Sequence, residues 1–111
     1  MIHVEAIWLA TEPMDMRAGP DTALARVIQV FGEARSHHAY LFANKRGNRV
    51  KILLHDGQGL WLLARRLHEG RFKWASPGRD KPRIELSDTQ LQALLIGLPW
   101  QQLDDPTIAV I

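Results

Sequence analysis

Residues 39–75 read AYLFANKRGNRVKILLHDGQGLWLLARRLHEGRFKWA, and short apolar runs alternate in them with polar turns. The turns fall at residues 45–48, 56–59 and 67–70, and each contains a glycine, the residue that tolerates the positive φ of tight turns. Apolar runs joined by such short turns are typical of an antiparallel meander. The segment therefore predicts four strands, over residues 39–44, 49–55, 60–66 and 71–74.

Within these strands, basic side chains alternate with apolar ones. Arg49 and Lys51 fall between the apolar residues of the second strand, and Arg71 and Lys73 between the aromatic residues of the fourth. Successive side chains of a strand point to opposite faces of the sheet. One face is therefore expected to pack on the core and the opposite face to be cationic.

Three further elements are expected outside the meander. Residues 2–9 have the pattern of a half-buried strand, and apolar residues at helical spacing predict a helix that begins at Pro20 and stops at Gly32. A second helix follows the capping-box sequence SDTQ at residues 87–90 and is expected to end at Gly97 or Pro99. The expected fold is α+β, an antiparallel sheet of about five strands with two helices packed on one face.

The length of 111 residues suits a single domain, residues 1–111, with residues 98–111 as a loosely packed tail. The chain has no cysteine, which excludes disulfides and thiolate chemistry. It also shows neither a secretory leader pattern nor an apolar run of membrane-spanning length. A cytoplasmic protein without membrane contact is expected.

The net charge of +2 conceals an uneven distribution along the chain. Residues 1–44 have 3 Lys or Arg and 5 Asp or Glu, residues 45–83 have 11 and 3, and residues 84–111 have 0 and 4. Clustered cations are typical of a surface that binds a polyanion such as nucleic acid. The simpler alternative is a solvated surface that balances the acidic ends. The candidate nucleic-acid-binding residues are Lys45, Arg46, Arg49, Lys51, Arg65, Arg66, Arg71 and Lys73.

The residues typical of catalytic and metal sites are dispersed. His37 and His38 are adjacent, so in a strand they would point to opposite sides. The acidic residues are isolated among cations and turns, whereas a metal-dependent nuclease needs two or three that converge. The turn at residues 56–59 has no phosphate-loop lysine. No catalytic residue, metal ligand or cofactor is therefore predicted.

Six stretches of the sequence together resemble a known family. They are residues 8–17 (WLATEPMDMR), 41–46 (LFANKR), 50–53 (VKIL), 56–59 (DGQG), 65–74 (RRLHEGRFKW) and 91–97 (LQALLIG). In their order and spacing they resemble the TnpB-type accessory protein, which is encoded by the second small open reading frame of a bacterial insertion-sequence transposon family. The resemblance implies a non-catalytic accessory role in DNA transposition, with the transposase and a co-encoded accessory protein as partners.

Two functions stay open on the sequence alone. The chain could bind the DNA of the transposon ends through its eight candidate cations. Alternatively, it could be an interaction module that docks onto the transposase or the co-encoded accessory protein without contacting DNA. For that second function the candidate residues are Asp15, Met16 and Arg17, which otherwise form an ordinary ion pair or cap in a loop. The sequence does not predict the oligomeric state.

Overall fold

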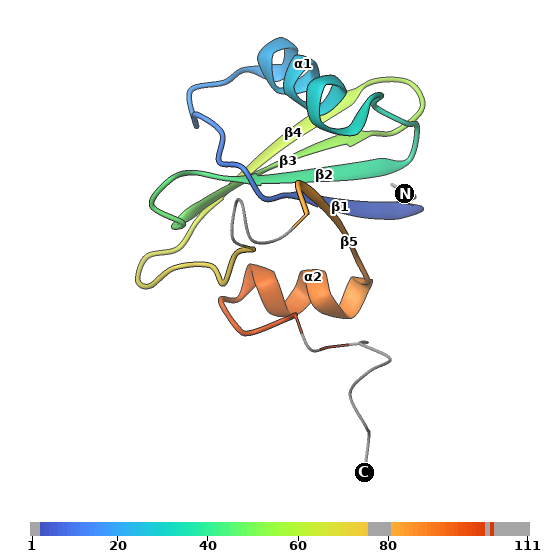
Figure 1. Ribbon diagram of the computed structural model, residues 1–111. Coiled ribbons are helices and arrows are strands. Elements are labelled where there is room, and N and C mark those ends of the chain that lie inside the picture. Colours follow the sequence, from blue (N-terminus) through green and yellow to red (C-terminus); the bar gives the residue numbers. More distant parts are fainter. Residues whose placement is uncertain (1–2, 76–80, 102, 104–111) are drawn as a thin grey trace.

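The computed structural model describes residues 3–75, 81–101 and 103 as five strands and two helices (Figure 1). The elements are β1 (Ala6–Ala10), α1 (Pro20–Phe31), β2 (His38–Ala43), β3 (Arg49–His55), β4 (Leu60–Arg66), β5 (Arg83–Leu86) and α2 (Asp88–Leu95). The predicted α+β class and the number of strands are confirmed. No helix in the described part of the chain is long and apolar enough to cross a membrane.

The five strands form one sheet in the order β4-β3-β2-β1-β5. Strands β2, β3 and β4 are joined by two hairpins and pair antiparallel, and β5 pairs antiparallel with β1. Strand β1 runs parallel to β2, because α1 carries the chain back across the sheet between them. The sheet is therefore mostly antiparallel with one parallel pair, and β4 and β5 are its edges.

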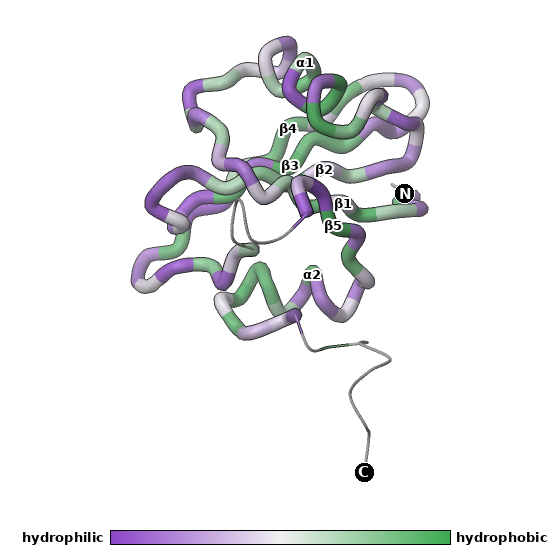
Figure 2. Tube along the Cα trace, viewed as in Figure 1, coloured by the Kyte–Doolittle hydropathy of each residue, from purple (hydrophilic) through white to green (hydrophobic). Residues whose placement is uncertain are grey.

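The two helices lie on opposite faces of this sheet, whereas the sequence predicted both on one face (Figure 1). On one face Leu9 and Leu41 pack with Leu94 of α2, and on the other Phe42 packs with Val27 of α1. All of residues 39–43 are buried, so both faces of β2 pack against other elements of the fold. Figure 2 shows hydrophobic segments in the strands and in both helices, while the connecting loops are mostly hydrophilic.

Helix α1 begins and ends at the residues that the sequence predicted. Pro20 occupies its first turn, where a missing N–H costs no helical hydrogen bond. Gly32 ends it with φ of 88° and donates its N–H to the Ile28 carbonyl at 2.8 Å. A side chain at that φ would be strained, so the glycine fixes where the helix stops.

The fourth strand predicted at residues 71–74 is absent, and those residues form an irregular segment. Buried Phe72 donates its N–H to the Gly47 carbonyl at 2.7 Å, and the Trp74 indole donates to the Ala10 carbonyl at 2.9 Å. These bonds hold the segment across the α2 side of the sheet. The fifth strand is instead β5, four residues that the sequence analysis assigned to no strand.

Helix α2 has the predicted capping box. The Ser87 hydroxyl accepts from the Gln90 N–H at 3.1 Å, and the Gln90 side-chain oxygen accepts from the Ser87 N–H at 2.9 Å. The helix ends at Leu95, before the expected Gly97 or Pro99. Trp100 is buried and its indole donates to the Lys73 carbonyl, so this part of the predicted tail packs on the core. Residues 102 and 104–111 of that tail lie outside the described residues.

Candidate functional site

The turn between β2 and β3 presents two cations at its tip. The Asn44 carboxamide oxygen accepts from the N–H groups of Asn48 at 3.1 Å and Arg49 at 3.0 Å. The Asn44 amide group also donates to the Asn48 side-chain oxygen at 2.8 Å. These bonds close the turn through side chains, and they leave Lys45 and Arg46 exposed to solvent.

The loop that precedes α1 is held against this turn. Met14 is buried and donates its N–H to the Ala43 carbonyl at 2.8 Å. The next residue, Asp15, accepts from the Arg17 guanidinium at 2.7, 3.1 and 3.2 Å and from the Arg17 N–H at 2.8 Å. Both side chains are exposed, so this fork-like pair orders the loop without being buried.

Cations from β3 and β4 lie beside the same loop. Arg49 is the direct cross-strand partner of Arg66, and Lys51 is the partner of Ala64. Directly opposed residues share a sheet face, so Arg49, Lys51 and Arg66 lie on the face that α1 covers only in part. The Lys51 ammonium donates to the Ala18 carbonyl at 2.7 Å and ties the sheet to the loop.

These elements enclose two adjoining hollows, of about 250 and about 600 Å³, which share Met16 and Arg49 in their walls. We call the combined surface the basic cleft. Its walls include the Pro13–Arg17 loop, the turn at Asn44–Arg46 and the adjacent ends of β3 and β4. Of the candidate cations, six line it: Lys45, Arg46, Arg49, Lys51, Arg65 and Arg66.

Two of the eight candidate cations lie elsewhere. Arg71 and Lys73 belong to the irregular segment after β4 and line neither hollow, so the single cationic sheet face expected from the sequence is wrong. Arg65 belongs to the wall of the smaller hollow, but its side chain points to the α2 side of the sheet. Its cross-strand partner is Val50, which packs in the core on that side, and its guanidinium donates to the Leu95 carbonyl. Arg65 and Arg66 therefore point to opposite faces of the sheet.

The six cations of the basic cleft lack acidic partners. Among the residues that the structure describes, the ion pairs within 4.0 Å are His3 with Glu5, Arg17 with Asp15, and Arg35 with Glu33. The one carboxylate in the cleft wall, Asp15, is engaged by Arg17. The cleft therefore has an excess of positive charge that the described side chains do not neutralise.

The Asp15 carboxyl is expected to titrate with a midpoint of about 2, well below its ordinary 3.8, and NMR of its side-chain carbon measures this. Hydrogen bonds from the Arg17 side chain and then from its backbone N–H lower the pKa of Asp15. A lowered pKa means that the ion pair is present above the ordinary value and is lost as the pH falls through about 2. In the variant Arg17→Gln the midpoint should rise toward 3.8. An unchanged midpoint would contradict the paired loop.

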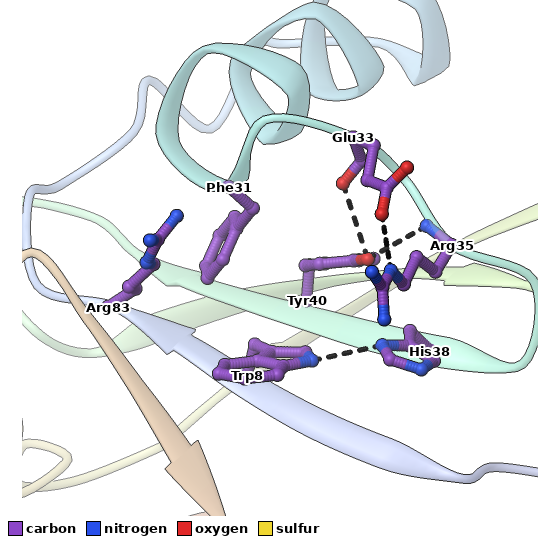
Figure 3. Close-up of a pocket in the computed structure, with 7 residues that line it drawn as sticks. All are labelled: Trp8, Phe31, Glu33, Arg35, His38, Tyr40 and Arg83. Atoms are coloured by element: carbon purple, nitrogen blue, oxygen red, sulfur yellow. Dashed lines mark hydrogen bonds and ion pairs between the residues drawn. The ribbon is translucent and has the colours of Figure 1, made fainter.

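A second pocket lies at the C-terminal end of α1 (Figure 3). Its volume is about 250 Å³, and its lining residues are Trp8, Phe31, Glu33, Arg35, His38, Tyr40 and Arg83. They come from β1, α1, β2, β5 and the loop before β2. No local pattern in the sequence groups these residues, because only the order of the strands in the sheet brings them together.

The aromatic groups of this pocket are fixed by hydrogen bonds. The Trp8 indole donates to Nδ1 of His38 at 3.0 Å. The Tyr40 hydroxyl accepts from the Arg35 N–H at 2.9 Å and donates to the Glu33 carbonyl at 3.4 Å. Burial of the phenol raises the pKa of Tyr40. Tyr40 is therefore a structural member of the pocket wall.

The acidic residue of the turn at residues 56–59 also has a structural role. Asp56 accepts from the N–H groups of Gln58 at 2.8 Å and Gly59 at 2.7 Å and from the Trp61 indole at 2.7 Å. These donors lower its pKa, since each stabilises the carboxylate. Within the described ranges, no three His, Asp or Glu side chains are grouped so as to hold a metal ion.

Comparison with known proteins gives one family. The family model described as IS66 Orf2 like protein matches residues 5–105. Two similar relatives, both from Sinorhizobium fredii, are uncharacterized proteins. The first, y4hO, is 34% identical over 86% of this chain and 82% of its own. The second, y4jC, is 28% identical over 87% of this chain and 82% of its own. No solved structure matches.

Proposed function

The chain belongs to the IS66 Orf2 like family, and from that membership we propose that it is a non-catalytic accessory protein that binds transposon-end DNA through the basic cleft. The family fits an accessory role in transposition. Contact with DNA goes beyond what the family membership supports. It rests on the charge and geometry of the cleft.

One observation supports DNA contact above all: six cations line one cleft, and no described acidic side chain pairs with them. Arg49 and Arg66 stand directly opposite each other, and like charges in that arrangement are destabilising. An anion between the two guanidinium groups would remove the repulsion. Phosphate suits this position, because guanidinium groups bind its oxygens with two parallel hydrogen bonds.

The arrangement also supports a role without catalysis. Strand transfer at a metal centre requires several carboxylates around divalent ions. The carboxylate in the basic cleft is paired with Arg17, and that in the second pocket is paired with Arg35. In the basic cleft and in the second pocket alike, the described residues that remain unpaired are cations and neutral side chains, and these can bind an anion.

Docking onto the transposase or the co-encoded accessory protein is the second candidate function. The observation that favours it is the ordered loop at Asp15, Met16 and Arg17, whose ion pair is exposed to solvent. This loop is a wall of the basic cleft, so a partner protein and DNA would meet at neighbouring surfaces. A pull-down with nuclease treatment separates the two functions, since direct docking survives the loss of DNA.

The test of DNA binding is a fluorescence-anisotropy titration of a labelled duplex with the sequence of the terminal repeats, repeated across a range of salt concentrations. If the five cleft cations other than Arg65 each neutralise one phosphate, log K should fall against log [salt] with a slope of about −4.5. An unrelated duplex of equal length reports how much of the affinity depends on sequence. A slope near zero, or no binding at low salt, would overturn the proposal.

A further inference from the structure

The pocket at the C-terminal end of α1 has an open aromatic wall (Figure 3). Trp8 and Phe31 are both half-buried, with ring centroids 6.1 Å apart and planes inclined at 60°. His38 stacks beside the indole at an interplanar angle of 20° and accepts its N–H. The indole is therefore held in one plane before any ligand arrives. A rigid aromatic surface loses little conformational entropy when a second ring stacks on it.

The charges around this wall indicate which ligand fits. Arg35 and Arg83 are both exposed at the pocket, and the single carboxylate, Glu33, is paired with the Nε of Arg35. Arg83 makes one long hydrogen bond, 3.4 Å, to the Val30 carbonyl. The pocket thus has a net positive charge and guanidinium N–H groups still free to donate. An aromatic ring with an attached anion suits it, and an organic cation does not.

The size of the pocket restricts the ligand further. About 250 Å³ is below the volume of typical sites for drug-sized molecules, roughly 300–1,000 Å³, and suits one planar ring system. A base inside a duplex is stacked on both faces and cannot enter. A base that is unpaired can leave the stack and lie on an aromatic side chain.

We propose that this pocket binds an unpaired nucleotide, with its base against Trp8 and Phe31 and its phosphate at Arg83 and Arg35. The nucleotide could belong to a single-stranded stretch of DNA or be free in solution, and the recognising chemistry is the same. This site is separate from the basic cleft. The proposal does not depend on duplex binding there.

The test uses the full-length protein with two probes, a short single-stranded oligodeoxythymidylate and free thymidine 5′-monophosphate, and measures binding by isothermal titration calorimetry. Trp8→Leu should weaken binding about tenfold or more, because it removes the stacking surface. Arg83→Gln should weaken it severalfold through loss of the phosphate contact. Lys81→Gln is the matched control: it removes an exposed cation two residues away that does not line the pocket, and it should leave the affinity within about twofold.

Each outcome decides the proposal. If only the oligonucleotide binds, and Trp8 and Arg83 are required, the ligand is single-stranded DNA; if the monophosphate also binds with the same requirements, a free nucleotide suffices. Equal affinity of wild type and both variants, or no binding of either probe, overturns the proposal. Because Arg83 is exposed, its variant is informative even if Trp8→Leu fails to fold. The duplex serves as a third probe, so loss of duplex binding at the cleft is distinguished from loss of nucleotide binding here.

Discussion

The double variant Arg49→Glu, Arg66→Glu is expected to bind terminal-repeat duplex on the order of a hundredfold more weakly than wild type at low salt. The two residues face each other across β3 and β4 and have no acidic partner among the described side chains. Reversal of both charges would remove phosphate contacts and repel the duplex. Anisotropy titrations at matched salt measure the loss. The slope of log K against log [salt] should also become shallower by about 2, because two phosphate contacts are lost.

The matched control is Lys73→Glu with Lys81→Glu. Both residues are exposed, neither lines the basic cleft, and the net charge changes by the same amount. This control should retain most of the affinity. In the double variant Arg49→Glu, Arg66→Glu, two like charges still face each other across the strands, so its thermal stability should stay close to that of wild type. Equal loss of binding in both double variants would mean that overall charge, and not the cleft, determines affinity.

A Phe42→Ala variant is expected to lose about 3–5 kcal/mol of unfolding free energy, measured by urea denaturation. Phe42 is 0% exposed at the centre of the sheet and packs edge-to-face on Phe31 of α1, with centroids 6.3 Å apart. Domains of this size are stable by only about 5–15 kcal/mol, so the variant should be marginal at 37 °C.

Leu63→Ala on the edge strand β4 is the comparison for this stability prediction. Leu63 is 48% exposed and its truncation removes fewer carbon atoms than Phe42→Ala, so the variant should lose only about 1 kcal/mol or less. If Phe42→Ala costs no more than Leu63→Ala, the α1 side of the sheet is not a packed core. The assignment of one core to each face of the sheet would then be wrong.

Local signals in the sequence were enough for the elements that local chemistry determines. Pro20 and Gly32 bound α1, and the box from Ser87 to Gln90 caps α2, because each depends on neighbours a few residues away. The two hairpins follow from turn residues in the same way. The placement of the helices did not follow, because nearly continuous apolar strands at the centre of a sheet do not show which face each helix covers.

The candidate site was predicted in part for a similar reason. Alternation in β3 located Arg49 and Lys51 on one face, but the position of the loop before α1 depends on long-range bonds from Met14 to Ala43 and from Lys51 to Ala18. No local pattern predicts these bonds. For residues 71–74 the alternation was misleading, since two aromatic anchors in an irregular segment produce the same pattern as a strand.

The most direct test of the basic cleft as the DNA-binding surface is an NMR titration of ¹⁵N-labelled protein with the terminal-repeat duplex. If DNA binds in the cleft, the largest amide shifts should occur in residues 13–17, 44–51 and 64–66, which line or adjoin it. The amides of α2, on the other side of the sheet, should remain unchanged. Shifts concentrated on α2 and β5, with none along the cleft, would contradict DNA binding in the cleft.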